Sequence, residues 1–249
     1  MLPSYNLDKI KFGVDKPTFD KAVDIYDSGG VKSFEDTGFG FSAKVKGSGD
    51  NFYEVYVPAK QYDHGSCDCY LGQRDILCKH MIALAICAVM GGGQLSEEDK
   101  ELTDSPECSG RAGELKKTEL LEIKAEISVA MRYIKPYNGP SRLWHRYQDS
   151  LLEGCRRLTV IISDFPVSKQ TAKLLIDLLL RLDKKLCYGG VDDSDGTVGS
   201  FMYEVVDILI EFTELDSACI KTFFVLCDKK TCFGWEEKLV EILDEANVD

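Results

Sequence analysis

One window of fourteen residues, Cys67 to His80, constrains this chain more than any other feature. It gathers three of the ten cysteines and one of the three histidines. The spacing is Cys67-x-Cys69, eight intervening residues, and then Cys78-x-His80. Three thiolates with one imidazole are a standard ligand set for structural zinc, which prefers four such ligands in a tetrahedron. The window therefore predicts one zinc site with these four residues as its ligands.

The sequence on either side of the window predicts how the site is held. "FGFSAKVKGSGDNFYEVYV" (39–57) alternates apolar and polar side chains on both sides of "GSGDN", which predicts a β-hairpin with one apolar face that includes Phe39. "MIALAICAVM" (81–90) is apolar on nearly every face and is followed by three glycines, which predicts a buried helix. A run with helical spacing that begins at Phe19 predicts a short helix before the hairpin.

The positions of the four ligands agree with these elements. Cys67 and Cys69 follow the hairpin, where residues separated by one in extended chain point to the same side. Cys78 and His80 cannot share a face inside a helix, so we expect them where the chain enters one. The backbone N–H groups and the helix dipole at that point also favour a thiolate.

A site with four protein ligands leaves no place for an activated water, so it stabilises structure and does not catalyse. Its formal charge of −1 can be offset by Lys79 and Arg74. Two other interpretations remain open. The first, a cluster of unrelated buried cysteines, does not explain the spacing. The second is a cysteine–histidine nucleophile pair using His64 or His80, for which no acid partner or oxyanion motif is evident. His64 itself is expected at the surface, beside a ligand or in place of one.

The motif C-x-C-x8-C-x-H, after two strands and before a helix, resembles the SWIM zinc finger family over roughly residues 19 to 93. The upstream "AVDIYDSGGVKS" is also similar to the helix and turn that often precede the finger in prokaryotic members. The resemblance implies Cys67, Cys69, Cys78 and His80 as zinc ligands in a ββα finger that binds DNA or other proteins. It also implies a DNA-processing ATPase as a class of partner, because such fingers are found beside helicase-type ATPases and transposases.

Residues 94–113 are polar, acidic and rich in turn-forming residues, which predicts a linker between two domains. The first domain (1–93) would be a small zinc-binding α-β-β-α module with its finger core at 39–92. The second (114–249) has the apolar spacing of about six helices joined by short loops, which predicts an all-α bundle or a repeat-like stack. The expected fold class is α+β.

No stretch reaches the roughly 18 uninterrupted apolar residues of a membrane span, and the first residues lack the pattern of a signal peptide. We therefore expect a cytoplasmic protein that does not enter a membrane. Because the cytosol keeps thiols reduced, the seven cysteines outside the window are expected to be free, mostly as small buried apolar side chains. They are Cys87, Cys108, Cys155, Cys187, Cys219, Cys227 and Cys232.

The net charge of −12 argues against a protein that coats nucleic acid, because phosphate binding needs a local excess of Lys and Arg. The charge is nevertheless uneven. Residues 131–190 hold 11 basic and 5 acidic side chains, a net of +6, whereas residues 191–249 hold 4 basic and 15 acidic ones, a net of −11. An anionic partner would therefore use the middle of the chain or residues 1–93, where 10 basic side chains face 12 acidic ones.

Within the basic segment, "MRYIKPYNGPSRLWHRYQDSLLEGCRR" (131–157) mixes arginines with aromatic side chains, as surfaces for single-stranded nucleic acid do. Trp144, Tyr147 and Leu151 also fall at helical spacing, which is more typical of a core, and Arg156 and Arg157 would then belong to a solvated face. Both interpretations stay open at the level of sequence.

No residue constellation predicts catalysis, so we do not expect an enzyme. The favoured function is an interaction adaptor with protein partners, in which zinc fixes the shape of the finger and the helices supply a second docking surface. The alternative is a nucleic-acid (DNA) binding protein, whose contacts would be Gln73, Arg74 and Lys79 of the finger with Arg142 and Arg146 of the basic segment. Salt separates the two, because phosphate binding weakens steeply as salt rises.

Overall fold

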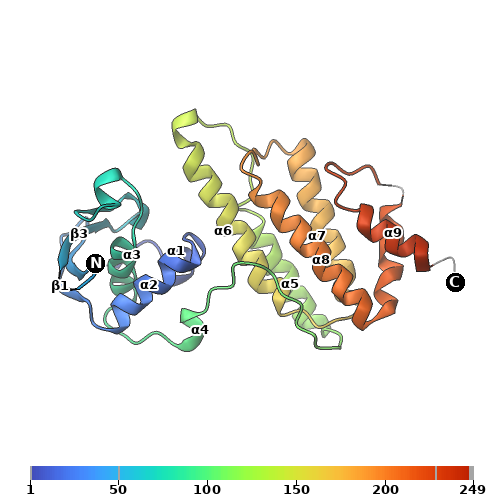
Figure 1. Ribbon diagram of the computed structural model, residues 1–249, viewed down its shortest axis with the longest axis horizontal. Helices are drawn as coiled ribbons and strands as arrows, with labels where there is room; N and C mark the ends of the chain where they lie inside the picture. Colours follow the sequence, from blue (N-terminus) through green and yellow to red (C-terminus); the bar gives the residue numbers. More distant parts are fainter. Residues whose placement is uncertain (1, 50, 228, 247–249) are drawn as a thin grey trace. The chain divides into compact units, whose positions relative to one another are not determined.

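A computed structural model describes residues 2–49, 51–227 and 229–246, without the side chains of Arg142, His145 and Arg146. The chain divides into two compact units, Met1–Leu102 and Thr103–Asp249 (Figure 1). Each unit has its own cluster of buried apolar side chains. The division falls inside the acidic segment 94–113, so that residues 94–102 belong to the first unit and residues 103–113 to the second.

The first unit is a small sheet covered by helices. Its helices are α1 (Leu7–Phe12), α2 (Lys16–Asp27), α3 (Lys79–Met90) and α4 (Glu97–Lys100). Its strands are β1 (Val31–Asp36), β2 (Gly40–Lys46), β3 (Phe52–Pro58) and β4 (Ser66–Cys67), which form one antiparallel sheet in that order. Helix α3 packs on β2 and β3, and α1 and α2 pack on α3 (Figure 1).

The hairpin predicted from the alternation is β2 and β3, and their inward residues are buried: Phe41, Ala43, Val45, Val55 and Val57. On the opposite face, Lys44 and Glu54 form an ion pair at 3.3 Å. Phe39 was expected on the apolar face, but it precedes β2 and is 85% exposed, so that prediction is wrong.

The sheet has two strands more than the predicted hairpin. Strand β1 was not predicted because its sequence "VKSFED" shows no alternation of apolar and polar residues. Of its residues, only Val31 is half-buried, and the others are exposed. Strand β4 has only two residues, Ser66 and Cys67, which is too short for any periodic signal. It pairs with β3 through Val55 and Tyr56, and this pairing fixes the first predicted ligand to the edge of the sheet.

Helix α3 is the buried helix predicted after the cysteine window. Eight of its twelve residues are buried, and it ends at Gly91, which adopts the left-handed conformation (φ 57°) that glycine favours at the end of a helix. Helix α2 begins at Lys16, before the predicted start at Phe19, because Asp15 caps it by accepting a hydrogen bond from the Thr18 amide at 2.9 Å.

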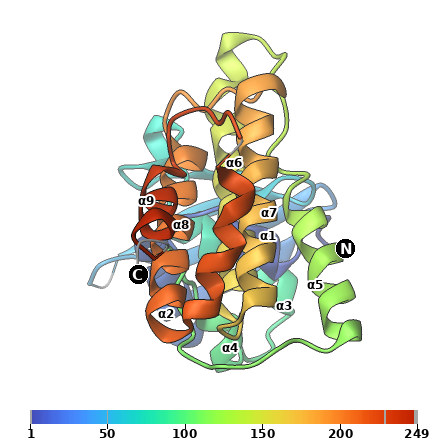
Figure 2. The ribbon, with the colours of Figure 1, turned by 90° about the vertical axis from the view of Figure 1, so that its right-hand side faces the viewer.

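The second unit is helical (Figure 2). It contains α5 (Lys117–Ala130), α6 (Trp144–Ser163), α7 (Lys169–Tyr188), α8 (Thr197–Leu215) and α9 (Glu237–Ala246), with short 3-10 turns at Ser141–Leu143. The segment Ser217–Leu226, predicted as one of six α-helices, is a 3-10 helix. Among the described residues, no helix has both the length and the apolar character needed to cross a membrane.

Cys187, at the end of α7, forms a disulfide with Cys232, across 45 positions of sequence. The expectation that both are free thiols is therefore wrong. Spacing alone does not reveal such a pair, because sequence does not determine connectivity. Cys155 and Cys219 are buried in the core as predicted, whereas Cys227 is exposed.

Candidate metal centre

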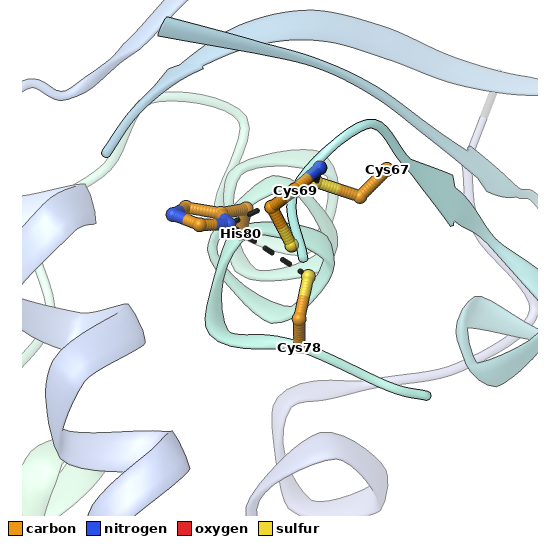
Figure 3. A group of neighbouring side chains, drawn as sticks. All are labelled: Cys67, Cys69, Cys78 and His80. Atoms are coloured by element: carbon orange, nitrogen blue, oxygen red, sulfur yellow. Dashed lines mark hydrogen bonds between the residues drawn. The ribbon is translucent and has the colours of Figure 1, made fainter. Parts of the chain in front are cut away.

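The structure brings the four predicted ligands together (Figure 3). Cys67 ends β4, and Cys69 lies two residues further on. Cys78 is the N-cap of α3 with extended backbone angles, and His80 is the second residue of that helix. The predicted position of Cys78 and His80 at a helix entrance is therefore confirmed. Pairing of β4 with the sheet and packing of α3 on the sheet together fix both halves of the cluster.

The distances fit a single metal ion. Nδ1 of His80 lies 3.8 Å from Sγ of both Cys67 and Cys78, and all four ligand atoms lie within 4.8 Å of one another. A tetrahedral ion about 2.3 Å from sulfur and about 2.0 Å from nitrogen separates those two ligand atoms by about 3.5 Å. The four side chains are between 1% and 6% exposed, so the cluster can fill a metal's coordination shell away from solvent.

Backbone N–H groups are directed at all three sulfurs. The Cys69 amide lies 3.5 Å from Sγ of Cys67, and the Gly72 amide lies 3.4 Å from Sγ of Cys69. Hydrogen bonds from the Cys67 thiol and the Met81 amide lower the pKa of Cys78 below that of an ordinary thiol, although burial raises it. The same hydrogen bond raises the pKa of Cys67, which acts as its donor. Because hydrogen bonds to a charged form favour that form, the amides of Cys69 and Met81 favour the thiolates of Cys67 and Cys78 that a metal requires.

His80 presents Nδ1 to the sulfurs and leaves Nε2 on the far side of the ring. That atom is buried and, among the described residues, has no hydrogen-bond partner. The imidazole instead packs against the ring of Tyr53, with ring centroids 4.6 Å apart. A neutral imidazole that binds a metal through Nδ1 carries its proton on Nε2, so contact with Tyr53 orients the ligand by packing.

Gly72 is a functional position that the sequence did not single out. A Cβ at this residue would lie 2.2 Å from the carbonyl oxygen of Cys67 and 2.6 Å from its Cβ. The loop from residue 70 to 77, called here the finger loop, can therefore fold against Cys67 only because residue 72 has no side chain. Its closeness to the cysteines in sequence was the sole hint available.

Two of the predicted contact residues of the finger, Gln73 and Arg74, bond to nearby backbone carbonyls. Gln73 donates to the Asp68 carbonyl at 2.8 Å. Arg74 donates to the Tyr70 carbonyl at 2.8 Å, and its guanidinium lies 3.6 Å from the centroid of the Tyr70 ring. Lys79 is half-buried at the start of α3. The Arg142 and Arg146 side chains lie outside the described part of the structure.

The core interpretation of the basic segment placed Arg156 and Arg157 on a solvated face, and this part of it is wrong. Arg156 is 6% exposed, and its guanidinium lies 3.4 Å from a carboxylate oxygen of Asp104. Arg157 pairs with the buried Glu153 at 3.0 Å. Tyr147 and Leu151 are buried, as the core interpretation predicted. These arginines hold the helical unit together and do not form a free basic surface.

His64, weighed as a nucleophile partner or substitute ligand, is exposed in the turn Tyr62–His64 and is not part of the cluster. A second group of ligand-type side chains consists of Asp183, Cys187 and Cys232. The two sulfurs of that group are joined in the disulfide, so neither is a thiolate ligand in this state. Asp183 accepts hydrogen bonds from the Cys232 amide at 2.8 Å and from Nε1 of Trp235 at 3.0 Å.

No protein-family model matches the chain, and no curated protein or solved structure is detectably similar to it. What the chain itself provides is a buried set of three cysteines and one histidine at metal-ligand distances. A metal ion fits this donor set, and four protein ligands complete a tetrahedral shell without leaving a position for water.

Proposed function

We propose that this chain is a non-catalytic interaction adaptor of the SWIM zinc finger type, in which one structural zinc ion is bound by Cys67, Cys69, Cys78 and His80. The donor set supports zinc, because three thiolates and an imidazole in a closed tetrahedral arrangement are typical of structural zinc sites. Binding at such a site stabilises folding by about 10–16 kcal/mol in small zinc fingers. The same closed arrangement supports a role without catalysis.

The observation that carries the adaptor role is the surface of the finger loop. Tyr70, Leu71 and Ile76 are 69%, 40% and 48% exposed, and they lie between the two halves of the metal cluster. Apolar side chains displayed by a fixed loop are typical of a surface that binds another protein, since their burial against a partner is favourable. Zinc would hold this loop in the conformation that the partner recognises.

A protein partner is therefore the expected ligand, and a DNA-processing ATPase is the class that the SWIM resemblance suggests. Nucleic-acid binding is the second candidate, favoured by the exposed Arg74 guanidinium stacked on Tyr70. A cation beside an exposed aromatic ring is a combination that also binds single-stranded nucleic acid. We place it second because the side chains of Gln73 and Arg74 already bond to the backbone carbonyls of Asp68 and Tyr70.

The test combines metal analysis with partner capture. Zinc content would be measured by mass spectrometry of the purified chain, and we expect one zinc ion per chain, lost in Cys78→Ser. Immobilised wild-type protein would then be compared with the loop variant Tyr70→Ser/Ile76→Ser for capture of an ATPase from its own cell extract. Phe39→Ser is the matched control, because it removes an aromatic side chain that is 85% exposed outside the loop.

Capture that the loop variant loses and Phe39→Ser retains would support the adaptor. In parallel, fluorescence anisotropy of labelled single- and double-stranded DNA and RNA would be recorded across a salt series. Binding with a steep salt slope that Arg74→Ala weakens would establish the nucleic-acid function in place of the adaptor. A chain that contains no zinc when purified, or that cannot be loaded with it, would contradict both.

A further inference from the structure

Helices α5 and α7 of the second unit run side by side in the same direction and are tied together near both ends. Near their starts, the Leu115 amide donates to Oε1 of Gln170 at 3.0 Å. Near their ends, Nζ of Lys185 donates to the Ile134 carbonyl at 2.6 Å. Figure 2 shows α5 at the edge of the helical unit. The contacts at the two ends therefore frame a space between the middles of the helices.

That space is an elongated groove. Its first part is a hollow of about 540 Å³ between α5 and α7, and a second hollow of about 310 Å³ adjoins it, since Arg181 and Lys184 line both. The groove is open to solvent along both helices, so a segment of another protein can reach its floor.

The floor of the groove is aliphatic. Ile127 of α5 and Leu174 and Leu178 of α7 line it, and each is less than 9% exposed. Such a floor offers no hydrogen bond to a polar ligand, but it favours insertion of apolar side chains. Helical partners supply these side chains at spacings of three and four residues along one face.

The rim of the groove is positively charged. Lys124 lies on the α5 side, and Arg181 and Lys184 lie on the α7 side, where Asp177 is the one acidic lining residue. Within the described part of the chain, no carboxylate lies within ion-pair distance of these three cations, although the chain as a whole carries a net charge of −12. Unpaired cations around an apolar floor complement a ligand that is acidic outside and apolar inside.

We propose that the groove between α5 and α7 binds an amphipathic helix of a partner protein whose polar face is acidic. Leucine-type side chains of that helix fill the hollow over Ile127 and Leu178, and its carboxylates pair with Lys124, Arg181 and Lys184. The inference rests on the adaptor function proposed above, to which it adds a second surface and the chemistry of that surface's partner.

Other occupants fit the groove less well. Helix α9 of this chain is itself acidic and amphipathic, but Leu239 and Leu243 are buried in its own core, so α9 of a second copy has no free apolar face. Single-stranded nucleic acid would pair with the rim, yet the floor offers no aromatic ring for stacking, and Tyr188 lies only at the far end.

The test uses the full zinc-loaded chain and fluorescence anisotropy. The probe is a labelled peptide of about 18 residues, made of leucine and glutamate with leucines at helical spacings i, i+3, i+4 and i+7. A scrambled peptide of the same composition and a single-stranded oligonucleotide are the comparison ligands. We expect the amphipathic peptide to bind at least about tenfold more tightly than the scrambled one, because only the former presents its apolar side chains on one face.

Three variants locate the binding. Arg181→Glu/Lys184→Glu reverses the rim and should weaken binding at least about tenfold. Lys221→Glu/Lys230→Glu makes the same change of charge at exposed positions outside the groove and should leave binding unchanged. Ser128→Phe places a ring from an exposed lining position into the hollow and should also weaken binding.

Equal binding of the two peptides, absence of binding, or an equal loss in both charge variants would overturn the proposal. Binding that survives Ser128→Phe would do the same, since it would be electrostatic only. Tighter, rim-dependent binding of the oligonucleotide would assign the groove to nucleic acid instead. The finger-loop variant Tyr70→Ser/Ile76→Ser should bind the peptide normally, so failure at the groove is distinguishable from failure at the finger.

Discussion

The replacement Gly72→Ala tests whether the conformation of the finger loop supports the geometry of the four metal ligands. The new Cβ would lie 2.2 Å from the Cys67 carbonyl oxygen, whereas ordinary contacts begin near 3.4 Å, so the loop must retreat by about 1 Å. Metal sites tolerate deviations of only about 0.2 Å in ligand distance. The retreat would also remove the hydrogen bond from the Gly72 amide to Sγ of Cys69.

Loss of a supporting contact of this kind typically weakens metal binding by about 10- to 100-fold. A hydrogen bond to a charged atom contributes about 1.5–3 kcal/mol by itself. We therefore expect Gly72→Ala to weaken metal binding by about 100-fold. A hundredfold change corresponds to about 2.7 kcal/mol. Zinc affinity would be measured by competition with a chromophoric chelator of known zinc affinity.

Gly38→Ala is the matched control for Gly72→Ala. A Cβ at residue 38 meets nothing within 4 Å, although its left-handed backbone (φ 83°) makes the replacement locally unfavourable. This variant should lose some stability and keep the zinc affinity of the wild type. If Gly72→Ala also kept wild-type affinity, the loop would not support the cluster, and the role assigned to this glycine would be refuted.

Three further outcomes are expected. Removing zinc with a strong chelator should unfold the first unit and leave the second folded, since each has its own core; circular dichroism of the full chain would show loss of part of the helical signal only. Cys187→Ser should lower the free energy of unfolding of the second unit by about 4 kcal/mol, from the chain entropy of a loop spanning 45 positions, and should make denaturation insensitive to reductant; Cys227→Ser should behave as wild type. Asp183→Ala should cost about 3 kcal/mol in the same denaturation assay, because the Cys232 amide and the Trp235 indole N–H lose their buried acceptor.

The sequence predicted those parts of the first unit whose side chains repeat with a period. The alternation of β2 and β3 and the apolar run of α3 reflect burial on one side and on all sides, so each can be detected locally. The pair Cys78 and His80 was placed at a helix entrance by geometry alone. By contrast, β1 is exposed to solvent along most of its length, and it belongs to the sheet because it pairs with β2.

The features that the sequence did not predict depend on residues distant from one another along the chain. The disulfide joins Cys187 to a residue in another segment, and neither sequence context marks its partner. The ion pair of Arg156 with Asp104 converts an apparently solvated cation into a buried one. The groove lies between α5 and α7, which α6 separates in the chain, and no local sequence pattern encodes that arrangement.

The position of the finger loop in the candidate metal centre separates the residues that can hold the metal from the side chains that the loop exposes. The ligands lie before and after the loop, and Gly72 of the loop lies directly against Cys67. The side chains of Tyr70, Leu71 and Ile76 are 69%, 40% and 48% exposed, and none of them is one of the four ligands. Mutations at those three positions can therefore accumulate at little cost to folding. The exposed surface of this loop can therefore change in evolution while the four ligand residues stay constant.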